Sequence, residues 1–310
     1  MLRNLADFAM QGRWQAAITA SFLAVTALFL PPLNYLASGL LVLATLRTGP
    51  REGAKVLLVA LLVFTLAATW IFSQPLLAVI LFVSSWLPVY LITLVLGFSR
   101  SLAKALITAG LIGLIGVAAV HVLVASPAAW WQTTLQPFVA LLLDQPGWQL
   151  SVSETEAVFA NLSTVMTGLF AAAIVFNAIV AVLIGRAWQA SLYEPGAFGE
   201  EFRSLKLGKV PAVATAILMV LSISGMLDAL PVLADMLPVM LLLFTLQGIA
   251  IVHALVKQKQ KAMGWLIAMY VLLVLVTPQM ASLLATFGIT EQWFNFRKLP
   301  LDNAKSIEKQ

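Results

Sequence analysis

Long apolar runs alternate with short polar loops along almost the whole chain, and each run is bounded by charge, by proline or by both. An α-helix rises about 1.5 Å per residue, so about 20 apolar residues cross a hydrocarbon core of roughly 30 Å. A spanning barrel would instead show short segments of alternating polarity. The pattern predicts an all-α, polytopic membrane helical bundle of eight or nine apolar segments: 14–30, 33–46, 56–72, 76–97, 105–125, 164–184, 210–226, 232–255 and 264–288.

Prolines modify this pattern at both ends of the chain. The first two segments are short and meet at Pro31 and Pro32, which predicts a tight hairpin. Pro278 lies in the middle of the last segment and removes a helical hydrogen bond. That segment therefore either crosses the membrane once or forms two half-helices that enter and leave on one side, covered by protein.

Composition supports a lipid environment and narrows the chemistry. Residues are 61% hydrophobic and only 10% charged, whereas a soluble domain needs far more charge to cover its surface. The chain has no cysteine and only two histidines, so we expect no disulfide, no metal site and no bound cofactor. The net charge of +5 is spread over short loops, which favours anionic lipid headgroups as partners and argues against nucleic acid.

The basic residues predict an orientation, because short loops rich in lysine and arginine stay in the cytoplasm. The charged residues of the alternate loops are all aspartate or glutamate. We therefore expect a multi-pass protein of the bacterial inner membrane with a cytoplasmic N-terminus. Arg297, Lys298, Lys305 and Lys309 conflict with nine full crossings, which would place the tail outside. Fourteen of the eighteen basic residues agree with the orientation: Arg3, Arg13, Arg47, Arg51, Lys55, Arg100, Lys104, Arg186, Arg203, Lys206, Lys209, Lys257, Lys259 and Lys261.

A charged loop follows the sixth segment, at residues 187–209, and its charges place it in water. Its stretch "FGEEFRSLKLGK" spaces Phe198, Phe202 and Leu205 as one apolar stripe of a helix. One interpretation is an interfacial helix on the membrane surface. The other is a docking surface for a cytoplasmic partner, formed by this stripe together with Arg203.

Several segments in order carry a resemblance: "LRTGPREGAK", "YEPGAFGEEFRSLKLGK", "LLFTLQGIAIVHALV" and "FGITEQWFNFRK". The chain resembles the YybS-like family of uncharacterised bacterial membrane proteins, a domain of unknown function. That family is distantly similar to the substrate-capture subunits (S components) of energy-coupling-factor transporters. The resemblance implies a six-helix bundle at 1–186 with an outward-facing solute pocket, and a membrane coupling subunit as partner. The loop at 187–209, helices at 210–289 and a polar tail at 290–310 depart from that pattern.

Small residues form two stripes with two interpretations each. Ala16, Ala20 and Ala24 recur every four residues in the first helix. S components are similar in using such an alanine face to bind the coupling subunit, and small residues let helix backbones approach closely. Packing within the bundle explains the same spacing, and it also explains the glycines of "GLIGLIG" in the fifth segment.

Polar side chains within apolar segments face a bundle interior or a cavity, because lipid does not solvate them. By depth we place the candidates in or near one outer mouth, beneath the external stretch 126–163 with its three tryptophans. They are either interhelical contacts or the lining of a lidded, outward-open pocket for a small solute. The candidate solute-binding residues are Asn34, Gln74, Trp86, His121, Asn161 and Asn177.

Enzymatic motifs are weak, and we assign no catalytic residue and expect no enzyme. Ser224 and His253 lie at opposite ends of neighbouring segments, whereas a serine–histidine pair must hydrogen-bond. Asp228 and Asp235 lie in a predicted outer loop without an evident acid–base partner. We therefore expect solute capture or transport, with a non-transporting membrane scaffold acting through its cytoplasmic loops as the alternative.

Overall fold

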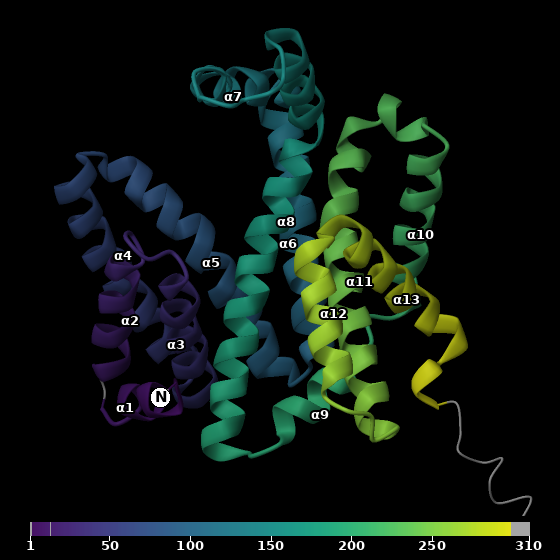
Figure 1. Cartoon of the computed structure of the whole chain (residues 1–310). Helices are drawn as coiled ribbons and strands as arrows, with labels where there is room; N and C mark the ends of the chain where they lie inside the picture. Colours follow the sequence, from purple (N-terminus) through teal and green to yellow (C-terminus); the bar gives the residue numbers. More distant parts are fainter. Residues whose placement is uncertain (1, 13, 299–310) are drawn as a thin grey trace, which may run out of the picture.

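The computed structural model describes residues 2–12 and 14–298, and within them the chain is entirely helical, without a strand. Figure 1 shows most of the helices standing side by side. Five helices are long and apolar enough to cross a membrane: α4 (Pro50–Phe72), α5 (Pro75–Ser99), α6 (Leu102–Leu123), α8 (Val152–Tyr193) and α11 (Pro231–Gln258). They confirm the prediction of an all-helical chain and indicate a multi-pass membrane protein.

The N-terminal group comprises α1 (Leu2–Ala9), α2 (Gln15–Thr26), α3 (Leu33–Thr48), α4 and α5. The chain turns at Pro31 and Pro32 between α2 and α3, so the predicted hairpin is present. Gly49 alone separates α3 from α4, and its φ of +102° is a conformation that a side chain would disfavour. Pro50 then starts α4, where its missing N–H has no helical partner to lose.

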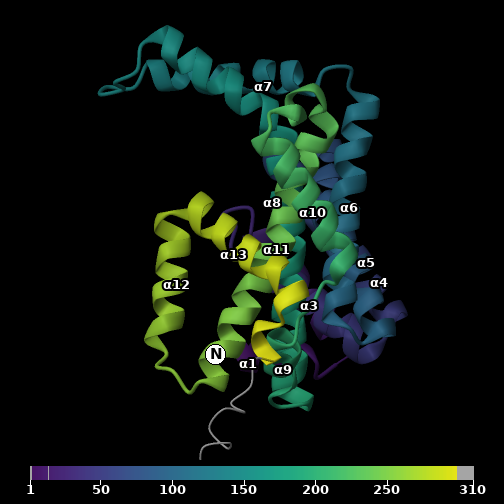
Figure 2. The ribbon, with the colours of Figure 1, turned by 90° about the vertical axis from the view of Figure 1, so that its right-hand side faces the viewer.

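The centre of the molecule is α8, which packs against α3, α5 and α6 as well as α11. Its 42 residues span about 63 Å, roughly twice the hydrocarbon thickness. A capping box formed by Ser151 and Glu154 starts it. The predicted sixth segment, 164–184, is only the middle of this helix. Its first turns pair with α7 (Pro127–Leu143), and Figure 2 shows this outer arm extending sideways from the bundle.

The C-terminal group begins with the short helix α9 (Ala197–Arg203) and continues through α10 (Lys209–Ile223), η1 (Met226–Ala229) and α11. Three elements follow: α12 (Gly264–Leu275), α13 (Thr277–Phe294) and η2 (Phe296–Lys298). Helices α11 and α13 cross at two glycines. A Cβ on Gly248 would collide with the backbone of Leu284, and one on Gly288 with the backbone of Phe244. Glycine at these positions lets the two backbones touch.

The last predicted segment is broken at Val276, where α12 ends and the proline-initiated α13 begins. Figure 2 shows the chain doubling back at this break. Arg297, just beyond α13, donates hydrogen bonds to the carbonyl oxygens of Arg203 and Leu205. The segment is therefore two half-helices whose ends lie on one side of the bundle.

This reversal removes the conflict in the charge pattern, because Arg297 lies at the same end of the molecule as Arg203 and Lys257. At that end the guanidinium of Arg47 also lies 4.1 Å from the ring centroid of Tyr193. We call it the basic end. Arg13, Lys305 and Lys309 lie outside the described residues. That the basic end faces the cytoplasm stays a prediction.

Candidate functional site

Three helices bring polar side chains together inside the N-terminal half of the molecule. The indole Nε1 of Trp86 on α5 donates to Oδ1 of Asn34 on α3, over 3.0 Å. The amide nitrogens of Asn34 and of Asn177, on α8, each donate to Oγ of Ser85 over 3.3 Å. Three of the six predicted solute-binding residues, Asn34, Trp86 and Asn177, thus meet at Ser85, which sequence reasoning did not single out.

This cluster lies on the wall of a cavity of about 450 Å³. Phe82 and Trp86 stack there with ring centroids 4.6 Å apart. Among the described residues, none that lines the cavity carries a charge. We call it the amide cavity, and its lining comprises Ala24, Ala27, Leu28, Pro31, Pro32, Asn34, Tyr35, Phe64, Leu81, Phe82, Ser85, Trp86 and Asn177.

Several hydrogen-bonding positions in the amide cavity are unused, and two of them belong to Asn177 and Ser85. Oδ1 of Asn177 is buried and has no partner among the described residues. Oγ of Ser85 accepts two amide N–H groups, which occupy both lone pairs of a hydroxyl, so its O–H proton remains to be donated. A buried polar atom without a partner is costly. The wall of the cavity therefore holds at least one unused acceptor and one unused donor.

Local sequence explains how these groups are placed. Pro31 and Pro32 set the start of α3, and Asn34 falls in its first turn. Pro88 inside α5 cannot donate to the carbonyl of Ser84, which loosens the helix beside Ser85. Trp86 is 1% exposed, and a buried indole N–H requires an acceptor, which Asn34 supplies.

The amide cavity lies away from the basic end. Asn177 precedes Arg186 by nine residues and Ser85 precedes Arg100 by fifteen. At about 1.5 Å per helical residue these separations are roughly 14 Å and 22 Å. The polar cluster therefore lies roughly 14–22 Å along the helices from the arginines of the basic end.

His121 does not join this cluster and lies at another buried site. Its Nε2 is 2.7 Å from Oδ2 of Asp235, and the two side chains are only 9% and 3% exposed. Oδ1 of Asp235 also accepts the backbone N–H of Gly168 over 2.9 Å. The placement of Asp235 in an outer loop is corrected, because this residue is in α11 and pairs with His121 between α6 and α8.

Gln74 and Asn161 are exposed and line neither buried site. The tryptophans of the outer stretch pack on α8 instead of covering the amide cavity. Trp131 donates to Thr167, and Trp148 donates to Thr155, each over 2.9 Å. Among the described residues of 126–163, none lines the cavity, so the predicted lid is not formed by this stretch.

The alanine face of the first helix requires a correction. Ala16, Ala20 and Ala24 are buried against α3 and α4 within the chain, so they do not present a free face to a partner helix. The opposite face of α2, with Ile18 and Phe22, is the exposed one. Small side chains let α2 approach its two neighbours, which is the packing interpretation. Gly110 and Gly113 of α6 act similarly toward α8 and α11, whereas a Cβ on Gly116 would meet open space.

The proposed docking stripe also requires a correction. The short helix α9 ends at Arg203, so Leu205 lies beyond it and is buried. Phe198 stacks on Phe202, whose ring contacts the imidazole of His253. The stripe faces the protein because α11 offers it an apolar surface. Of the four docking residues only Leu205 is buried, and Phe198, Phe202 and Arg203 are partly exposed.

The end of α8 holds this loop in place through charge. Arg186 is buried, and its guanidinium pairs with Glu201 of α9 and with Glu194. His253 hydrogen-bonds the hydroxyl of Tyr270 over 2.9 Å. Ser224 donates to the carbonyl of Leu221, so the serine and the histidine have different partners.

The resemblance to YybS-like proteins and S components therefore stays a prediction. The structure supplies a helical bundle and a cavity whose roles are argued from this chain alone. No protein-family model, curated protein or solved structure matches the chain.

Proposed function

We propose that this protein captures or transports a small, uncharged solute that binds in the amide cavity. The observation that carries the proposal is the convergence of Asn34, Trp86 and Asn177 on Ser85 in one cavity. Pockets that bind small molecules are mostly apolar with a few placed polar groups, and they measure roughly 300–1,000 Å³. The amide cavity, at about 450 Å³, has this character.

The lining favours a particular solute chemistry. The stacked rings of Phe82 and Trp86 give the cavity a buried apolar wall, which suits an apolar planar ring. The hydroxyl proton of Ser85 and Oδ1 of Asn177 match a solute with one acceptor and one donor close together. A charged solute would lose its hydration without gaining a counter-charge. The proposed solute is therefore a neutral planar molecule with an amide-like edge.

The position of the cavity supports uptake from outside. If the basic end faces the cytoplasm, the amide cavity lies in the outer half of the bilayer. A solute would then enter from the external side. The scaffold alternative acts through the cytoplasmic loops, and in the loop at 187–209 Leu205 is buried while Phe198 and Phe202 are partly exposed.

The test is a stability screen on the purified full-length protein. The probes are uncharged nucleobases and aromatic amides, each compared with a carboxylate of similar shape. We expect at least one uncharged probe to raise the melting temperature, because a ligand that binds only the folded state stabilises it. The same probe should lose this effect in Asn177→Ala and retain it in Asn161→Ala, whose side chain is exposed. A shift lost equally in both variants, or given only by the carboxylates, would contradict the proposal.

A further inference from the structure

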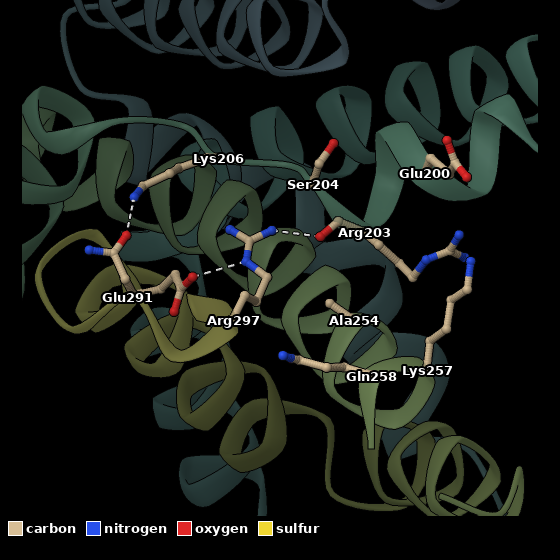
Figure 3. Close-up of a pocket in the computed structure, with 10 residues that line it drawn as sticks. Glu200, Arg203, Ser204, Lys206, Ala254, Lys257, Gln258, Glu291 and Arg297 are labelled. Carbon is tan, nitrogen blue, oxygen red and sulfur yellow. Dashed lines mark hydrogen bonds and ion pairs between the residues drawn. The ribbon is translucent and has the colours of Figure 1, made fainter. Parts of the chain in front are cut away.

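A second cavity lies at the basic end and shares no lining residue with the amide cavity. Its volume is about 620 Å³. Figure 3 shows side chains from the loop after α8, the end of α11 and the end of α13 reaching into it. We call it the basic cavity, and its lining comprises Glu200, Arg203, Ser204, Lys206, Ala254, Lys257, Gln258, Glu291, Asn295 and Arg297.

A buried ion pair builds the frame of this cavity. Glu291 is 2% exposed and accepts from Nε of Arg297 over 2.9 Å. The other guanidinium nitrogens of Arg297 donate to the carbonyl oxygens of Arg203 and Leu205, over 2.6 and 3.0 Å. Gln247 of α11 also accepts the N–H of Leu207 over 2.7 Å. These bonds fix the backbone of the loop, so its cations are held in position before any ligand arrives.

The charges that remain after this pairing are mostly positive. Glu291 and Arg297 neutralise each other. Arg203, Lys206 and Lys257 then stand against a single carboxylate, Glu200. Among the described residues, neither Arg203 nor Lys257 has a carboxylate within ion-pairing distance. Figure 3 shows the ends of these two side chains directed toward each other, an arrangement that an anion between them would stabilise.

Exposed aromatic residues place the basic cavity at the membrane surface. Trp293 and Phe294 end α13 directly before the lining residue Asn295, and Trp265 lies in the first turn of α12. Tryptophan is enriched where hydrocarbon meets the headgroups. A basic pocket between helices at this depth is suited to the phosphate of a lipid headgroup.

We propose that the basic cavity binds the phosphate group of an anionic membrane lipid. The guanidinium of Arg203 presents paired donors to two phosphate oxygens, and the ammonium of Lys257 adds a point charge. Lys206, held by Asn295 over 2.7 Å, borders the same space. The bound lipid would join α9 to α11 and α13. This inference is independent of the solute proposed for the amide cavity.

The experiment measures lipid binding by the purified full-length protein in phosphatidylcholine nanodiscs to which phosphatidylglycerol is added. Native mass spectrometry counts the retained lipid, and a melting curve follows stability. We expect phosphatidylglycerol to be retained in preference to phosphatidylcholine. The double variant Arg203→Gln, Lys257→Gln should weaken this binding by about fivefold for each cation removed.

Three comparisons decide the result. Lys104→Gln removes an exposed cation from the same end but outside the cavity, and it should leave binding unchanged. Lys257→Arg keeps the charge and should retain the preference, which separates charge from damage to the fold. Equal loss in Lys104→Gln, or no preference between the two lipids, would overturn the proposal. Inorganic phosphate that displaces the lipid completely would overturn the lipid assignment and identify a soluble phosphate ester as the occupant.

Discussion

Trp86 and Asn34 lie 52 positions apart in the sequence, yet the indole Nε1 of the first donates to Oδ1 of the second over 3.0 Å. This hydrogen bond joins α5 to α3 on the wall of the amide cavity. The same asparagine uses its nitrogen to reach Ser85, so one side chain fixes two groups of α5. Because Trp86 is buried and the bond is partly shielded from water, the bond contributes both to stability and to the shape of the cavity.

Replacing Trp86 by phenylalanine tests this bond. Trp86→Phe retains an apolar ring but leaves Oδ1 of Asn34 without its donor, which costs about 1–3 kcal/mol for a buried acceptor. We expect a lower melting temperature in detergent. Trp70→Phe is the control, because Trp70 is exposed and makes no side-chain hydrogen bond among the described residues. Equal melting temperatures for the two variants would argue against a structural role for the bond.

Ser85 is predicted to be the centre of the solute site. Ser85→Ala leaves the amide nitrogens of Asn34 and Asn177 without their acceptor and removes the free hydroxyl proton. Loss of one such contact to the solute corresponds to roughly a tenfold lower affinity. Titration with the probe found in the stability screen measures it. Ser84→Ala changes the neighbouring exposed serine and should bind as the wild type does.

The buried pair of His121 and Asp235 is predicted to stabilise the junction of α6, α8 and α11. Asp235→Ala leaves the imidazole and the N–H of Gly168 without an acceptor, and breaking a buried pair in this way costs about 3–5 kcal/mol. Unfolding by denaturant measures the loss. Asp228→Ala removes an exposed carboxylate nearby in the sequence and should have little effect. A similar loss in both variants would mean that net charge, not the pair, is responsible.

The crossing of α11 and α13 is predicted to tolerate no side chain at Gly248. Gly248→Ala places a Cβ against the backbone of Leu284, and neither helix backbone can move away easily. We expect a clear loss of stability and of folded yield. Gly116→Ala is the control, since a Cβ there meets open space and alanine favours a helix by about 1 kcal/mol. Equal yields would place the two helices further apart than the structure does.

The broken last segment predicts which positions are accessible from the same side. The chain has no cysteine, so single replacements can be labelled without background. Asn295→Cys and Gln258→Cys should react with a membrane-impermeant reagent on the same side of sealed vesicles. Ser73→Cys, at the far end of α4, should react on the opposite side. Labelling of Asn295→Cys from the same side as Ser73→Cys would instead mean that the last segment crosses the membrane completely.

Hydropathy predicted where the helices lie because lipid imposes the same requirement on every spanning segment. Hydropathy did not decide whether the last segment crosses the membrane once or forms two half-helices. That choice depends on α11, whose Gly248 accepts the backbone of α13. Hydropathy also underestimated the length of α8, because the first turns of this helix are polar and pack against α7 instead of against lipid.

The candidate site was predicted in part for a similar reason. Depth along each helix placed Asn34 near the outer end of its helix and Trp86 and Asn177 closer to the middle, and in the structure all three line one cavity. Gln74 and Asn161 have comparable depth, but their side chains are exposed. Asp235 was missed because it lies in the first turns of the predicted segment 232–255, where an acidic side chain was assigned to the adjoining outer loop. Direction around a helix axis is set by packing partners, which one sequence does not identify.

The uninterrupted length of α8 has a mechanical consequence. Asn177, in the amide cavity, and Arg186, which pairs with Glu201, lie on one helix that is unbroken between them. If a solute displaces Asn177, the unbroken helix between the two residues transmits that displacement to Arg186. Occupancy of the amide cavity would then reach the loop at 187–209 through one helix backbone, without a chain of intermediate residues.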